Sequence, residues 1–154
     1  MKIAVMACVE MIGKSGINFN HLADIPTGVT PLVSSICFQM HWSQATLHPP
    51  KDHGSKASVE GIVFPGDSIA ICDDVGTSGG SLVKGIEIAN AAQLNVMDEV
   101  FVLMDREQGA REALAAVGKS LNALYTLRRA LTYYDDGGTM PHNKYVECME
   151  FLDR

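Results

Sequence analysis

The sequence predicts an α/β fold, a parallel sheet with helices on both faces. Residues 68–72 (SIAIC) and 100–104 (VFVLM) are short, continuous apolar runs, which is typical of strands buried on both faces of a parallel sheet. Residues 81–94, between them, have apolar side chains at helical spacing. A strand, a helix and a strand in this order form the repeating unit of such a sheet.

The rest of the chain continues this alternation. We expect further strands over residues 21–25, 44–47 and 121–126, and helices over residues 31–40, 110–117, 127–134 and 141–152. Residues 48–58 contain two prolines and a glycine and show no period, so they are expected to form a long loop. Tyr133 and Tyr134 are expected to end a helix that packs on the sheet.

Length and composition predict one globular domain. The chain has 154 residues, of which 47% are hydrophobic and 19% charged. We divide it into a short N-terminal stub (residues 1–18), whose first residues are a short strand or helix, and a core (residues 19–154). The formal net charge is −6 and there is no basic run, which argues against a nucleic-acid partner.

The cysteines and the apolar runs indicate a cytoplasmic protein. The four cysteines form no CxxC pair and no cluster with histidines at zinc-ligand spacing, so free thiols in a reducing cytosol are the simplest interpretation. No apolar stretch is long enough to span a bilayer.

Chemistry is concentrated in residues 69–81, IAICDDVGTSGGS. Asp73 and Asp74 follow the apolar strand, so they lie at its carboxyl end, where open α/β sheets bind ligands. Their oxygens can accept hydrogen bonds from ribose hydroxyls or help to hold Mg²⁺.

The turn that follows is suited to an anion. Its glycines let backbone N–H groups approach closely, its hydroxyls add donors, and a helix N-terminus adds partial positive charge. The residues concerned are Thr77, Ser78, Gly79, Gly80 and Ser81. Acids and turn together suit a ribose 5-phosphate, and the alternative is a solvated Asp-Asp turn with a flexible Gly-Ser loop.

Four stretches resemble the type I phosphoribosyltransferases, and more narrowly the orotate phosphoribosyltransferases. They are ADIPTGVTPL, KDHGSKASVEG, ICDDVGTSGGS and VLMDREQGAREAL. The resemblance runs from about Phe19 to the C-terminus. It implies the parallel-sheet, Rossmann-like fold of that family with a reduced hood, and a transferase of pyrimidine (UMP) biosynthesis.

The resemblance also implies roles for residues. Asp73 and Asp74 would bind the ribose hydroxyls of phosphoribosyl pyrophosphate, and the turn from Thr77 to Ser81 would hold its 5-phosphate. Arg106 would meet orotate, although a surface ion pair with its neighbours Asp105 and Glu107 is the alternative.

Lys51 and His53 would close over the pyrophosphate. The alternative is that both are ordinary loop residues without a role in binding. The resemblance implies Mg²⁺ as the cofactor, held through pyrophosphate and ribose near the paired aspartates rather than by a dedicated protein site. It also implies a homodimer, because in the family this loop reaches into the neighbouring subunit's site.

Three departures from the family pattern predict weakened activity. The N-terminal section that covers the orotate pocket in the family, its hood, is short in this chain. Leu47 and His48 stand where the family has an Arg-Lys pair. Gly28 stands where a Lys is frequent. The alternatives are a non-catalytic relative that binds phosphoribosyl pyrophosphate and a transferase for another base. The resemblance also leaves open that this chain is a fragment of a longer protein, or one part of a fusion with a decarboxylase.

Overall fold

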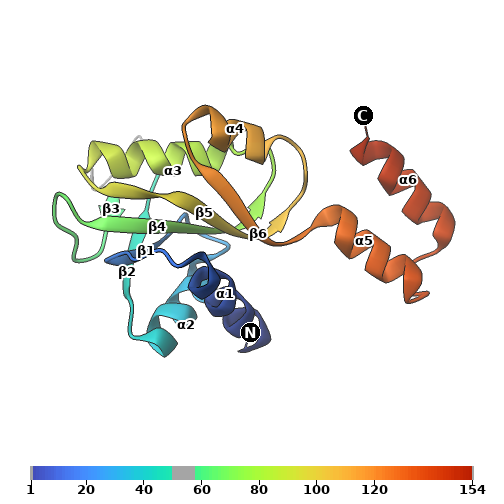
Figure 1. Cartoon of the computed structure of the whole chain (residues 1–154), viewed down its shortest axis with the longest axis horizontal. Coiled ribbons are helices and arrows are strands. Elements are labelled where there is room, and N and C mark those ends of the chain that lie inside the picture. The colour runs from blue at the N-terminus through green and yellow to red at the C-terminus, as the bar shows by residue number, and fades with distance from the viewer. Residues whose placement is uncertain (1, 50–57, 154) are drawn as a thin grey trace.

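The computed structural model describes residues 2–49 and 58–153 of the chain. Within these residues the chain forms one six-stranded sheet with the order β3-β2-β1-β4-β5-β6 (Figure 1). The strands are β1 (His21–Asp24), β2 (Ser43–Leu47), β3 (Val59–Glu60), β4 (Ser68–Gly76), β5 (Asn95–Asp105) and β6 (Ser120–Thr126). The helices are α1 (Lys2–Ser15), α2 (Thr30–Met40), α3 (Gly80–Ala91), α4 (Ala110–Ala116), α5 (Leu127–Asp136) and α6 (His142–Leu152).

The expectation of a parallel sheet is confirmed for five of the six strands. β1 pairs in parallel with β2 and β4, β4 with β5, and β5 with β6. The two-residue strand β3 is antiparallel to β2 and was not predicted. It is too short to show a periodic pattern, and only its pairing with Thr46 and Leu47 defines it as a strand.

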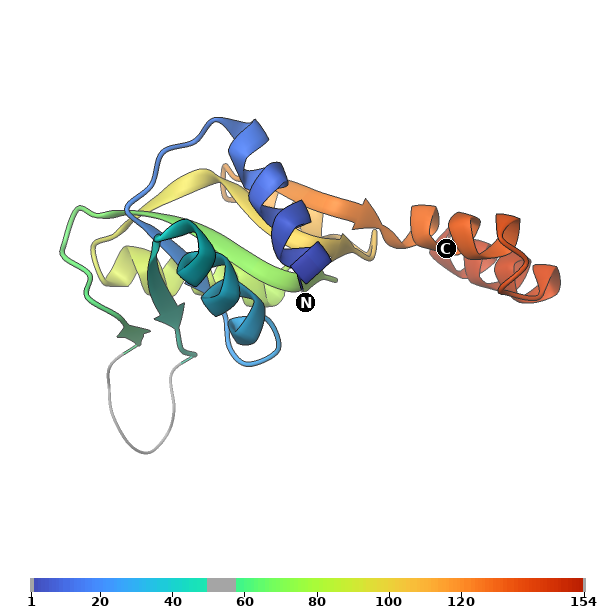
Figure 2. The same ribbon diagram turned by 90° about the horizontal axis from the view of Figure 1, so that it is seen from below.

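Helices cover both faces of the sheet, α3 and α4 on one and α1 and α2 on the other (Figures 1 and 2). Successive residues of β4 point to opposite faces. Ile69 and Ile71 belong to the core under α3 and α4, whereas Ala70 and Cys72 belong to the core under α1 and α2. This double burial is the physical reason why the strand is apolar at every position.

The N-terminal stub is a helix. α1 buries Val5, Cys8 and Ile12 in the same core as Phe101 of β5. The sequence left strand or helix open here because an apolar run of this length is compatible with both.

The last two helices form an arm that extends away from the sheet (Figure 2). Helix α5 was predicted, but the prediction that its end packs on the sheet was wrong. Tyr133 and Tyr134 are 76% and 48% exposed, and Leu131 is the one residue of α5 that is buried. Within the described residues, no helix is long and apolar enough to cross a membrane.

Candidate functional site

The paired aspartates lie inside strand β4. The sequence predicted that the strand ends at Cys72, which was wrong, because β4 continues to Gly76. Asp73 lies opposite Val102 of β5, and Gly76 lies opposite Asp105, so pairing with β5 extends the strand past the apolar run. Both carboxylates are nevertheless near the carboxyl end of the central strand, as expected.

The Asp73 side chain is buried. It is 7% exposed, and burial raises its pKa to about 6. The backbone N–H of Asp74, 2.8 Å from its Oδ1, lowers that pKa, the charge of Asp74 raises it, and a hydrogen bond from Ser81 lowers it. Asp73 is therefore coupled to the turn that opens α3.

Asp74 lies against the turn that follows β1. A Cβ atom on Gly28 would collide with Oδ2 of Asp74. Gly28, which stands where the family frequently has a Lys, therefore leaves the space that the Asp74 carboxylate fills. The two acids, adjacent in sequence, serve two different turns.

The turn from Thr77 to Ser81 has the features of an anion site. Gly79 has a φ of 81°, and a Cβ there would lie 2.8 Å from Cβ of Ala113, so only glycine fits. Among the residues that the structure describes, no side chain caps the N-terminus of α3, and Ser78, Gly80 and Ser81 are exposed. The N–H groups at this helix end thus lack a side-chain acceptor and are open to an anion.

Arg106 follows β5 at the same edge of the sheet. Its backbone N–H donates to the carbonyl of Gly76, 2.8 Å away, which ties it to the end of β4. The two acids beside it have other partners: Asp105 binds Nε of Arg111 at 2.7 Å, and Glu107 binds Arg128. Within the described residues the Arg106 guanidinium forms no ion pair, which contradicts the surface-pair alternative.

Lys51 and His53 fall outside the described residues. Leu47 and His48, which stand where the family has an Arg-Lys pair, are described. Leu47 is fully buried in the core under α3, and Nε2 of His48 lies 3.1 Å from Oε2 of Glu60. The Leu47 side chain therefore serves packing, and the His48 side chain makes a local contact with Glu60.

No cluster of three or more histidine, cysteine or acidic side chains that could hold a metal ion occurs in residues 2–49 and 58–153. The carboxylate oxygens of Asp73 and Asp74 are the ligand type that Mg²⁺ prefers. They fit a shared site in which a bound substrate supplies the remaining oxygens.

Two buried aspartates were missed by the sequence analysis. Asp24 is fully buried at the end of β1 and accepts hydrogen bonds from Thr30, Gln44 and Thr46. Asp105 is fully buried at the end of β5. The signal that identified Asp73, an acid directly after an apolar run, was present at Asp105.

Comparisons with known proteins point to one family. The chain is 36% identical over 126 residues to the orotate phosphoribosyltransferase of Bradyrhizobium sp. (strain BTAi1), covering 73% of this chain and 66% of that protein. It is 36% identical over 129 residues to the orotate phosphoribosyltransferase of Methanoculleus marisnigri, covering 81% and 75%. The chain therefore spans about two thirds of the length of the first relative and three quarters of the second.

A solved structure agrees with these relatives. The crystal structure of orotate phosphoribosyltransferase from Aeropyrum pernix is similar with a TM-score of 0.77 at 27% identity, covering 91% of this chain and 77% of that one. No model of a protein family matches the chain.

Proposed function

Since the chain belongs to the orotate phosphoribosyltransferase family, we propose that it transfers the 5-phosphoribosyl group of phosphoribosyl pyrophosphate to orotate. The products are orotidine 5-phosphate and pyrophosphate, a step of UMP biosynthesis. The observation that carries the proposal is the end of β4, where Asp73 is coupled to Ser81 at the N-terminus of α3 and Asp74 lies against the turn of Gly28. Among the described residues, no side chain caps that helix end.

The sugar phosphate is proposed to bind along this edge. The 5-phosphate accepts hydrogen bonds from the N–H groups and hydroxyls between Thr77 and Ser81. Asp73 and Asp74 accept hydrogen bonds from the two ribose hydroxyls. The turn holding Gly28 adjoins Asp74, so it would border the bound ribose as well.

Arg106 is proposed to bind the base. A planar guanidinium donates two parallel hydrogen bonds to a carboxylate or to adjacent carbonyl oxygens. Because its neighbours Asp105 and Glu107 bind other arginines, its donors remain available for a ligand. The preference for orotate over an uncharged base follows from this charge.

The reaction is a displacement at the anomeric carbon of ribose. The orotate nitrogen forms the new bond while the bond to pyrophosphate breaks, and negative charge grows on the leaving group. Mg²⁺, bound through substrate oxygens beside Asp73 and Asp74, would offset that charge. Lys51 and His53 are proposed to contact the pyrophosphate.

We also propose that the protein acts as a homodimer in the cytoplasm. Four free cysteines, three of them buried, suit a reducing compartment. Light scattering tests the assembly, and a monomer at micromolar concentration that turns over substrate contradicts the dimer.

The test of the activity is an absorbance assay. Purified protein with phosphoribosyl pyrophosphate and magnesium should consume orotate, and orotidine 5-phosphate should be found by mass spectrometry. A chelator and the double substitution Asp73→Asn/Asp74→Asn should each stop the reaction. Folded protein that gives no product at high concentration overturns the proposal.

A second candidate is a binding protein without catalysis. The burial of Leu47 and the contact of His48 with Glu60 favour it, because neither side chain is then directed to the leaving group. The loss of each such contact typically costs about 10²–10³ in rate. Calorimetry should then show binding of phosphoribosyl pyrophosphate, lost in the double aspartate variant, without any turnover.

A further inference from the structure

The turn that carries Arg106 is fixed on both sides. Before it, Asp105 is buried and bound to Arg111. After it, the backbone N–H of Glu107 donates to Oδ1 of Asp105, 2.8 Å away. The backbone of Arg106 itself is tied to Gly76. The direction of the Arg106 side chain therefore depends on how residues 105–107 are held.

Glu107 adopts a strained conformation that needs support. Its φ is 57°, in the left-handed region that glutamate rarely occupies. Its Oε2 accepts the backbone N–H of Arg128 at 3.1 Å, and its Oε1 lies 3.7 Å from Nε of Arg128. Since Arg128 is in the first turn of α5, the Glu107 carboxylate satisfies a free N–H there and complements the helix dipole.

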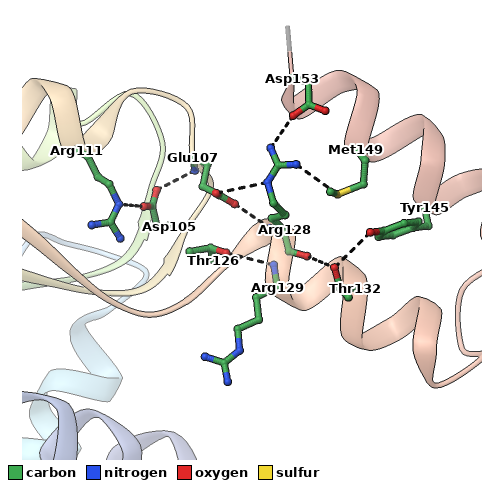
Figure 3. A network of polar contacts seen from close by, with 10 residues as sticks. All are labelled: Asp105, Glu107, Arg111, Thr126, Arg128, Arg129, Thr132, Tyr145, Met149 and Asp153. Atoms are coloured by element: carbon green, nitrogen blue, oxygen red, sulfur yellow. Dashed lines mark hydrogen bonds and ion pairs between the residues drawn. The ribbon is translucent and has the colours of Figure 1, made fainter.

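The Arg128 side chain extends this link to α6. Its Nη2 lies 2.8 Å from Oδ1 of Asp153, and its Nη1 lies 4.0 Å from Sδ of Met149 (Figure 3). One guanidinium thus joins the Arg106 turn, the start of α5 and the end of α6. An isolated exposed ion pair contributes little, but this one combines a helix cap with contacts to two helices.

The arm and Arg106 also border the same groove. It has a volume of about 560 Å³. Its lining combines the apolar side chains of the arm with three charged ones, and consists of Arg106, Leu127, Leu131, Lys144, Glu147, Cys148, Phe151 and Leu152. Apolar side chains beside the Arg106 guanidinium are the combination expected next to a planar anionic ring, and the charges of Lys144 and Glu147, which bind each other at 2.7 Å, offset one another.

We propose that Arg128 is a positioning residue for Arg106, acting through Glu107, so that the helical arm takes part in base recognition. This inference rests on the proposed function. It assigns to α5 and α6 a role in affinity for the base and none in affinity for phosphoribosyl pyrophosphate, which binds at β4 and α3.

The kinetic test compares two adjacent arginines of α5. Arg128→Ala should raise KM for orotate about tenfold and leave KM for phosphoribosyl pyrophosphate within about twofold. Arg129→Ala is the matched control, because the Arg129 side chain is exposed and points away from the network (Figure 3). Equal KM values for orotate in parent and Arg128→Ala overturn the proposal, and so does a similar rise for both substrates.

A second measurement needs no turnover. In ¹⁵N-labelled protein, the side-chain Nε–H resonance of Arg106, assigned through Arg106→Lys, should shift in Arg128→Ala and not in Arg129→Ala. If Arg128→Ala fails to fold, Glu107→Gln serves instead, and its loss of charge should move the same resonance. An unmoved resonance overturns the positioning role, whereas an inactive parent whose resonance does shift contradicts only the proposed function.

Discussion

Gly28 lies in the turn between β1 and α2, and its lack of a side chain leaves room for Asp74. Gly28→Ala should displace that carboxylate and weaken binding of phosphoribosyl pyrophosphate by about tenfold, measured by calorimetry. Gly13→Ala is the control, because a Cβ at this helical position meets nothing within 4 Å. Unchanged affinity in Gly28→Ala would mean that Asp74 is free to move without cost.

The buried Asp73 carboxylate lowers the free energy of unfolding by an amount that depends on pH. Burial raises its pKa from the ordinary 3.8 to about 6, so between these values the folded chain holds a proton that the unfolded chain has released. Stability therefore falls as pH rises from 4 to 6, and the full cost is present above 6. Asp73→Asn removes this cost.

Relative to the parent, Asp73→Asn should therefore raise the free energy of unfolding more at pH 8 than at pH 4. The two gains should differ by an amount on the order of 2 kcal/mol. Urea unfolding of parent and variant at both pH values measures it. The same stability difference at pH 4 and pH 8 would contradict the assigned pKa.

At the scale of elements, the helices on the sheet differ from the arm in what they bury. Leu114 of α4 is fully buried in the core, whereas Leu131 of α5 is 9% exposed in a two-helix arm. Leu114→Ala should lower the free energy of unfolding by about 3 kcal/mol, and Leu131→Ala by clearly less, because fewer neighbours close around its cavity. Chemical denaturation measures both, and equal losses would show that the arm packs as tightly as the core.

Elements were predictable from sequence where local pattern and burial agree. The continuous apolar runs of β4 and β5 and the periodicity of α3 reflect burial that the fold enforces at each position. The end of β4 and the existence of β3 were not predictable, since both depend on pairing with a neighbouring strand. A residue's strand partner leaves no mark in its own local sequence.

At the scale of the molecule, three buried thiols lie in one core. Cys8 of α1, Cys37 of α2 and Cys72 of β4 are buried in the core between these helices and the sheet, and burial raises the pKa of each, that of Cys37 to about 11. Cys148 on α6 is partly exposed.

Native protein should therefore react at one thiol rapidly with an aromatic disulfide reagent, and denatured protein at four. The absorbance of the released thiolate counts them. Cys148→Ser should abolish the rapid phase, and a rapid phase that persists in this variant would show that the core under α1 and α2 opens readily.

The sequence by itself determined the α/β class, the chemistry of residues 69–81 and the family resemblance. Each of these depends on short stretches of consecutive residues, such as the strand, the two acids and the turn of residues 69–81. Only the tertiary structure decided that Asp73 and Asp74 face different turns and that Arg106 has no ion-pair partner among the described residues. It also decided that the arm leaves the sheet (Figure 2). These outcomes depend on Gly28, Arg111 and Arg128, whose partners in space a linear pattern does not specify.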